Sequence, residues 1–291
     1  MKKIVLLKNN KPSVLLYTND IINTISYIQD FEGAIYTKSG CLNLNFIGLD
    51  GFNDTYIERI DPPHFIRSTY CPDTKTLYLQ AAGDGNLYRF YIETHRFAPI
   101  FGRKLLSDYQ TFRNTVPLID FHFNAMAQDA IVSTIWVAVP EKHCVVEVAG
   151  NRLTRAIGNG QVGFRYSNRL DMVMMNSPCG LAWDKKNRRL FVCDTGNELI
   201  YIFNVKSNNE KTLSRTIGNF DPNSPLDDCF TKPTSISYRN NKLFIVDNLM
   251  TSIKTYDCDT KELKQIYHSK GKIMLMDNVN DNDLLIVEDE S

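Results

Sequence analysis

The chain lacks the features that would assign it to a membrane or a nucleic acid. Its 33 basic and 33 acidic residues cancel, so no net field draws it to nucleic acid or an anionic membrane. No apolar run approaches the roughly 20 residues that a membrane-spanning helix needs. The N-terminal apolar stretch covers only residues 4–7, whereas a secretory signal needs about 7–15, so we expect no signal peptide.

Cysteine pairs and catalytic motifs are also missing. The seven cysteines are odd in number and scattered without a CxxC pair, which favours free, mostly buried thiols in a reducing compartment. Cys179 and Cys193 in particular are expected in the core as small hydrophobic residues. No GxSxG, HExxH or P-loop pattern occurs. We therefore expect a cytoplasmic protein without a cofactor, with a virus particle as the other location considered.

What the sequence does contain is a repeat. Short apolar runs follow polar turns at residues 33–38, 75–80, 134–139, 189–194, 242–247 and 283–288. A strand-like segment and a tight turn precede most runs, and two further strand-like segments follow, which gives four strands per unit. Units of about 40–50 residues with four strands are typical of propeller blades. The sequence predicts an all-β fold, a six-bladed β-propeller.

The two chain ends are predicted to be halves of one blade. Residues 3–18 match the pattern of the outer hairpin of a unit, and residues 272–288 match the inner hairpin. Sharing the last blade between C-terminal strands a and b and N-terminal strands c and d would remove two unpaired sheet edges. The alternative is a pair of unrelated terminal hairpins. The predicted boundaries within the single domain 1–291 are 272–291 plus 1–19 for blade 6 and about 20–60, 61–102, 116–158, 176–218 and 232–271 for blades 1 to 5.

The best-preserved unit, residues 157–205, resembles an NHL repeat. Its matching positions are Gly158, Gly160, Asn176, Pro178, Gly180, Val192, Asp194, Thr195, Gly196 and Asn197. The following unit matches more weakly, at Gly218, Pro233, Ile236, Ile245, Asp247 and Asn248. The resemblance implies a propeller and covers about a third of the chain.

The Asp-Thr-Gly-Asn turn of this unit is expected to be structural. Asp194 would accept hydrogen bonds from backbone N–H groups of the turn between the second and third strands, and Asn197 would act similarly. Gly196 would supply a positive φ. The basic residue that family members carry after this turn is absent, because Glu198 and the apolar residues after it occupy those positions.

The resemblance also raises an enzymatic alternative. Some NHL-type propellers are lyases that hold zinc on histidines of the central channel, and some six-bladed propellers hydrolyse lactones with calcium. Of the five histidines, only His64 and His122 fall on predicted innermost strands, with Asp120 nearby. A third channel histidine is missing, although catalytic zinc needs three protein ligands. We expect no catalytic residue; the alternative is a channel-centred metal-dependent lyase or lactonase-like hydrolase.

Partner binding is predicted on three long connections that should gather on one face: residues 103–117, 159–177 and 219–231. They are rich in aromatic residues, Met and Arg, the types enriched at interface cores. Packing of these side chains over the neighbouring blade is an equal alternative, with Arg165 and Arg169 as the exposed residues. The predicted partner-binding residues are Tyr109, Arg113, Phe164, Arg165, Tyr166, Arg169, Met174 and Phe220.

The favoured function is therefore a non-catalytic scaffold for protein–protein interaction or assembly, including a subunit of a large complex or virus particle. Its partners would be other proteins. Neutral net charge and a thin set of loop arginines argue against nucleic acid. A membrane partner and a small-molecule substrate are not expected either.

Overall fold

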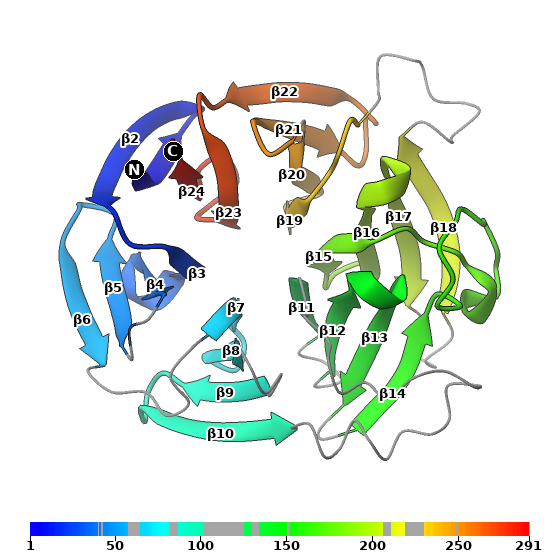
Figure 1. Ribbon diagram of the computed structural model, residues 1–291, viewed down its shortest axis with the longest axis horizontal. Coiled ribbons are helices and arrows are strands. Elements are labelled where there is room, and N and C mark those ends of the chain that lie inside the picture. Colours follow the sequence, from blue (N-terminus) through cyan, green and yellow to red (C-terminus); the bar gives the residue numbers. More distant parts are fainter. Residues whose placement is uncertain are drawn as a thin grey trace.

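The protein is an all-β propeller whose sheets surround a central channel (Figure 1). The computed structural model describes residues 1–39, 41, 43–57, 65–81, 87–101, 125–129, 134–149, 152–205, 211–218, 230–247 and 249–290. In this part of the chain the strands form six four-stranded antiparallel sheets, each called a blade below. The all-β propeller predicted from the sequence is thereby confirmed.

Blades 1 to 3 follow one another along the chain. Blade 1 contains β3 (Ile22–Ile28), β4 (Gly33–Lys38), β5 (Leu44–Gly48) and β6 (Asn53–Ile57), with a short 3-10 helix η1 (Gln29–Phe31) between β3 and β4. Blade 2 contains β7 (Phe65–Cys71), β8 (Thr76–Ala81), β9 (Leu87–Tyr91) and β10 (Arg96–Phe101). Blade 3 contains β11 (Ala125–Asp129), β12 (Thr134–Val139), β13 (Cys144–Ala149) and β14 (Arg152–Ile157), with η3 (Pro140–Lys142) between β12 and β13.

Blades 4 and 5 continue in the same order, and the last blade joins both ends of the chain. Blade 4 contains β15 (Pro178–Asp184), β16 (Arg189–Asp194), β17 (Leu199–Val205) and β18 (Lys211–Gly218), with η4 (Leu170–Met172) before it and η5 (Thr195–Asn197) within it. Blade 5 contains β19 (Ser235–Arg239), β20 (Lys242–Asp247), β21 (Ser252–Asp257) and β22 (Leu263–His268). Blade 6 contains β23 (Lys272–Asn278), β24 (Leu284–Asp289), β1 (Lys2–Lys8) and β2 (Lys11–Thr18).

The first strand of each blade in this order lies innermost. Each innermost strand contacts the next around the channel, from β3 through β7, β11, β15, β19 and β23 and back to β3. The ring of innermost strands is therefore closed. This closure places the channel at the centre.

Blade 6 has the shared composition that the terminal hairpins predicted. Its strand order is β2-β1-β24-β23, and β1 pairs with β24 from Lys2↔Asp289 to Leu7↔Leu284. The Lys3 ammonium lies 2.9 Å from Glu288 and 2.7 Å from Glu290. Although burial lowers the pKa of Lys3, hydrogen bonds to these two carboxylates raise it above its ordinary value. Both termini lie within this blade in Figure 1.

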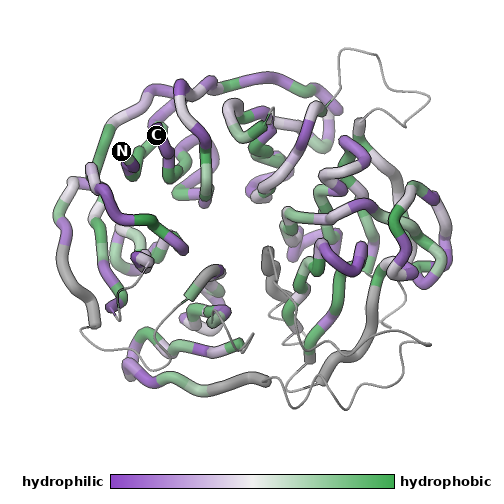
Figure 2. Tube along the Cα trace, in the orientation of Figure 1, coloured by the Kyte–Doolittle hydropathy of each residue, from purple (hydrophilic) through white to green (hydrophobic). Residues whose placement is uncertain are grey.

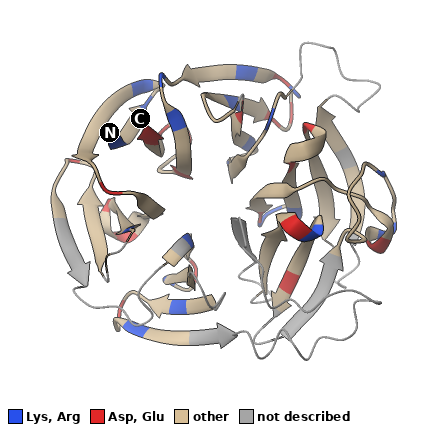
Figure 3. Cartoon of the chain, viewed as in Figure 1, with Lys and Arg blue, Asp and Glu red and all other residues tan. Residues whose placement is uncertain are grey.

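The continuous apolar runs of the sequence are the second strands of the blades, buried on both faces. In β16, Leu190 and Val192 pack toward blade 3, whereas Phe191 and Cys193 pack toward blade 5. The core is thus a series of apolar layers between blades rather than one central cluster. Figure 2 shows hydrophilic residues frequent along the outermost β22, and Figure 3 shows acidic and basic residues intermixed around the ring.

Candidate functional site: the β14–β15 lobe and the central channel

The Asp-Thr-Gly-Asn turn of blade 4 is structural, but its hydrogen bonds differ from those expected. Asp194 Oδ1 accepts a hydrogen bond from the Asn176 backbone N–H at 2.6 Å, and Asp194 Oδ2 accepts one from Asn197 Nδ2 at 2.6 Å. The backbone partner therefore lies before β15, in the preceding connection, and not in the turn after β16. Burial raises the pKa of Asp194 to about 7, although both hydrogen bonds oppose the shift. Asp194 thus fixes the start of its own blade's innermost strand.

The expectation of a positive φ at Gly196 is wrong. The left-handed residue of this turn is Glu198, with φ 60°. Gly196 is required for another reason: a Cβ there would overlap the Asn176 side chain, whose Oδ1 would lie 2.7 Å away. Asn176 Nδ2 also donates to the Gly196 carbonyl at 3.2 Å. Close approach rather than backbone conformation therefore selects glycine at this position.

Blade 5 has a carboxylate in the same role, and a lysine ammonium also contacts it. Asp247 accepts hydrogen bonds from the backbone N–H groups of Thr231 and Lys232, at 3.1 and 2.7 Å on Oδ1. The Lys254 ammonium lies 2.7 Å from Asp247 Oδ2. Asp194 has an amide, Asn197, in the corresponding role. The charge of Asp194 is therefore met by hydrogen bonds from Asn176 and Asn197, whereas an ammonium group contacts Asp247.

The connection from β14 to β15, residues 159–177, forms a folded lobe, called the lobe below. Its own backbone closes it, since Asn159 N–H donates to the Val173 carbonyl at 2.9 Å. Two side chains of blade 4 are hydrogen-bonded to the lobe. Asn197 Nδ2 donates to the Gly163 carbonyl at 2.8 Å, and the Tyr201 hydroxyl donates to the Met174 carbonyl at 3.0 Å. In Figure 1 the lobe lies beside β18 at the rim.

The lobe divides into a packed side and an exposed side. Val173 and Met175 are fully buried in the apolar layer between blades 3 and 4, as the packing alternative predicted. Val162, Phe164 and Tyr166 instead keep 59%, 37% and 49% of their surface exposed. The lobe therefore presents apolar side chains to solvent from a backbone that hydrogen bonds hold in place.

The predicted partner-binding residues of the lobe differ in their contacts and in their exposure. Phe164 stacks on Tyr201 with ring centroids 6.3 Å apart, and the Tyr166 hydroxyl donates to the Ser214 carbonyl on β18 at 3.1 Å. Arg165 and Arg169 are exposed, and Arg169 pairs with Asp171 at 2.8 Å.

Met174 and Val162 of the lobe differ in exposure. Met174 is half-buried, and a Cβ at Gly163 would lie 2.6 Å from its terminal methyl. Exposed Val162 was not predicted, because it lies alone between Gln161 and Gly163 with no periodicity to mark it.

The remaining predicted site residues lie outside the described part of the chain. These are Tyr109, Arg113 and Phe220 of the other long connections, and the metal candidates His64, Asp120 and His122. Among the residues that the structure describes, no group of three or more His, Cys, Asp or Glu could hold a metal ion. His143 has a local role there, since its Nδ1 accepts a hydrogen bond from the Ser177 backbone N–H at 3.1 Å.

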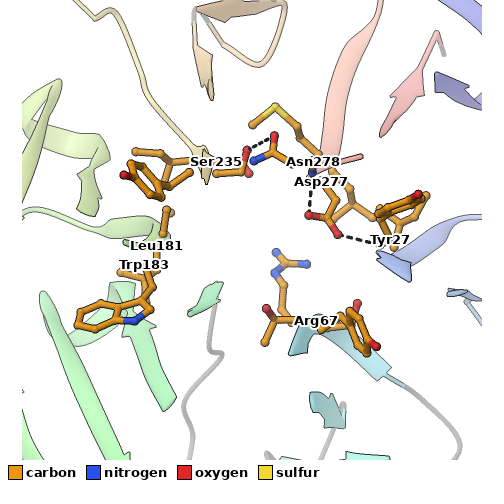
Figure 4. A pocket seen from close by; sticks show the side chains of 18 of the residues that line it. Tyr27, Arg67, Leu181, Trp183, Ser235, Asp277 and Asn278 are labelled. Atoms are coloured by element: carbon orange, nitrogen blue, oxygen red, sulfur yellow. Dashed lines mark hydrogen bonds between the residues drawn. The ribbon is translucent and has the colours of Figure 1, made fainter. Parts of the chain in front are cut away.

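The central channel is the second candidate site, with a cavity volume of about 820 Å³. Its wall comes mainly from β3, β7, β15, β19 and β23. Arg67 and Asp277 point into it from blades 2 and 6 (Figure 4). Cys179 also lines the channel, whereas Cys193 is fully buried, so the expectation of two core thiols holds only for Cys193. The sequence prediction missed both Arg67 and Asp277.

Substituting Gly196 by alanine should loosen the lobe without opening the ring. The new Cβ displaces Asn176 and breaks its bond to the Gly196 carbonyl, and we expect a loss of about 1–3 kcal/mol in the free energy of unfolding. Urea unfolding measures the loss, and limited proteolysis should cut within 159–177 faster than in the native protein. Asn168→Ala, at an exposed position of the same lobe, is the control. Equal stability and equal cleavage of Gly196→Ala and native protein would refute the steric argument.

Comparison with known proteins agrees with this fold. No family model matches the chain. A stretch of 106 residues is 31% identical to human NHL repeat-containing protein 2; the match covers 34% of this chain and 15% of that protein. The chain thus spans far less than two thirds of that relative's length.

Solved structures share the propeller at low sequence identity. The matched chain of a nidogen/laminin complex has a TM-score of 0.64 at 9% identity, with full coverage of both chains. A gluconolactonase from Xanthomonas campestris has a TM-score of 0.63 at 13% identity and covers 95% of this chain and 89% of its own. A streptogramin B lyase has a TM-score of 0.55 at 9% identity, covering 98% of each chain.

These likenesses define the class of the protein as a β-propeller. The partial match to an NHL repeat-containing protein and the motif residues of blades 4 and 5 support a likeness to NHL propellers. Within the described residues, no helix has the length and apolar character that crossing a membrane requires.

Proposed function

We propose that this protein is a non-catalytic, six-bladed scaffold that binds a protein partner through the lobe. The observation that carries the proposal is the exposure of Val162, Phe164 and Tyr166 on a backbone held by blade 4. Apolar side chains on a rigid segment lose little conformational entropy when a partner covers them. A purely structural connection gains nothing from exposing them to water.

The partner proposed is a folded protein with an apolar patch flanked by carboxylates. The apolar patch would cover Val162 and Phe164, which keep 59% and 37% of their surface exposed. Arg165 follows Phe164 in sequence and is exposed, and its guanidinium suits a carboxylate of the partner. Assembly into a larger complex is one form that this function would take.

Removing the apolar side chains should abolish partner capture. We expect Val162→Ser/Phe164→Ser, used as bait in a lysate of the source organism, to lose proteins that the native chain retains, with at least about tenfold weaker binding of each. Tyr166 stays in place because it also bonds to β18. Quantitative mass spectrometry of the captured proteins measures the loss.

The matched control removes two exposed apolar side chains elsewhere. Tyr17 and Phe52 are 57% and 60% exposed and lie away from blade 4, so Tyr17→Ser/Phe52→Ser should capture the same proteins as the native chain. If the lobe variant captures the native set, or if both double variants lose it equally, the lobe is not the docking site.

A second candidate function is a channel-centred metal-dependent lyase or lactonase-like hydrolase. The fold likeness to proteins described as a gluconolactonase and a streptogramin B lyase supports it, at 13% and 9% identity. Metal analysis of the purified full chain separates the two functions. Stoichiometric zinc or calcium that is lost in His64→Ala or His122→Ala would favour the enzyme over the scaffold.

A further inference from the structure

The central channel has the size and rigidity of a ligand site. Its cavity of about 820 Å³ lies within the range of about 300–1,000 Å³ that small-molecule pockets occupy. Hydrogen bonds between neighbouring innermost strands hold the wall: Ser26 to Ser68 at 2.7 Å, and Ser237 to Asn278 at 3.0 Å. The wall is therefore preformed, and a ligand would not have to order it.

One side of the channel carries a cation withdrawn from bulk water. Arg67 extends from β7 into the channel (Figure 4). Burial lowers the pKa of Arg67, because the surrounding wall replaces part of its hydration. A guanidinium starts from so high a pKa that it stays charged, and it presents a planar fork to carboxylates and phosphates. Such a group attracts an anion more strongly in the channel than on the protein surface.

The facing side carries a carboxylate with spare acceptor capacity. Asp277 Oδ2 accepts the Tyr27 backbone N–H and Oδ1 accepts the Asn278 backbone N–H, both at 2.8 Å. These two bonds fix the carboxylate on β23, and each oxygen retains a second lone pair. Asp277 lines the cavity and points into it, so the remaining lone pairs are placed for a hydroxyl donor.

We propose that the channel binds a small hydroxylated organic anion, whose carboxylate or phosphate pairs with Arg67 and whose hydroxyl donates to Asp277. This site lies apart from the lobe and uses none of its residues. Ligand binding in the channel is therefore independent of the scaffold function, and each can fail without the other.

Titration calorimetry on the full chain tests the anchoring cation. The probes are glycerate, citrate and glycerol 3-phosphate, with neutral glycerol as the contrast. We expect at least one anion to bind, glycerol not to bind, and Arg67→Gln to weaken binding at least about tenfold. Arg96→Gln removes a positive charge from the exposed end of β10 in the same blade and should bind as the native chain does.

The role of Asp277 is tested by comparing two acids that differ in their hydroxyl groups. Glycerate should bind at least about tenfold more tightly than propionate, which lacks the hydroxyls, and Asp277→Ala should bring the two acids to within about threefold. Circular dichroism verifies that each variant folds. If Arg67→Gln does not fold, Arg67→Lys replaces it, with several-fold weaker binding expected because the planar fork is lost.

The proposal is overturned by any of three results. The first is that none of the three anions binds the native chain at about 10 mM. The second is that an anion binds to Arg67→Gln, or to the folded Arg67→Lys, as tightly as to the native chain. The third is that the preference for glycerate over propionate is unchanged in Asp277→Ala.

Discussion

Deleting residues 1–19 is expected to unfold the propeller rather than to trim it. The deletion removes β1 and β2, leaves β24 paired only with β23 and so with one open edge, and takes Ile4, Val5 and Leu7 out of two apolar layers. Burying three such side chains contributes about 5–9 kcal/mol. A domain's whole stability is only about 5–15 kcal/mol, so the loss is comparable to it.

Urea unfolding and size-exclusion chromatography measure this effect. The truncated chain should show no cooperative transition and should aggregate through the exposed edge of β24. Adding a synthetic peptide of residues 1–19 should restore a soluble, cooperative species, because the peptide supplies the same two strands. A truncated chain as stable as the full one would show that the shared blade does not hold the ring.

The stability of the native protein is expected to fall as the pH rises from about 4 to about 7. Burial raises the pKa of Asp194 from 3.8 to about 7 and that of Asp277 from 3.8 to about 6. Between these values the folded chain binds more protons than the unfolded chain, so each proton removed destabilises it. The contribution of Asp194 is at most about 4 kcal/mol and that of Asp277 at most about 3 kcal/mol.

Unfolding free energies measured between pH 4 and pH 8 test this linkage. Asp194→Asn and Asp277→Asn each remove one titration, so the stability of each variant relative to the native chain should rise with pH across the window. The slope is the readout, since a constant offset also contains the altered hydrogen bonds, such as that from Asn197.

Asp184 is expected to change the stability with pH in the opposite direction to Asp194 and Asp277. Burial raises its pKa, but hydrogen bonds from Asn187 and Arg189 outweigh burial and lower it below 3.8. Asp184 therefore stabilises the folded chain above about pH 4, and the advantage of the native chain over Asp184→Asn should shrink as the pH falls below that value. For Asp194, the burial argument would be contradicted if the free energies of unfolding of Asp194→Asn and of the native chain changed in parallel with pH.

The sequence predicted the blade pattern because the pattern is local. Each second strand is buried on both faces, which requires continuous apolar runs such as residues 189–194 and 242–247. The terminal hairpins were recognisable because the turn Asn9-Asn10 and the turn near Asn282 separate clear apolar segments. Strand pairing across the whole chain then followed from the need to leave no unpaired edge.

The sites were harder to predict because their contacts are tertiary. The partner of Asp194 is the backbone N–H of Asn176, 18 residues earlier, and the crowding that selects Gly196 comes from the side chain of that same residue. Nothing in the local sequence marks Glu198 as the left-handed residue.

Strand irregularities hid the channel residues. The register of β7 shifts between Phe65 and Arg67, and that of β23 shifts between Ile273 and Leu275. A bulge of this kind reverses which residues of a strand face the channel, so simple alternation could not place Arg67 or Asp277.

Hydrogen exchange on the native chain, free and bound to a captured partner, tests the docking role of the lobe most directly. We expect slower exchange of backbone amides within residues 159–177 on binding, with exchange in the blade 1 turn around Phe52 unchanged. Protection confined to other faces of the propeller, with the lobe exchanging as in the free protein, would contradict it.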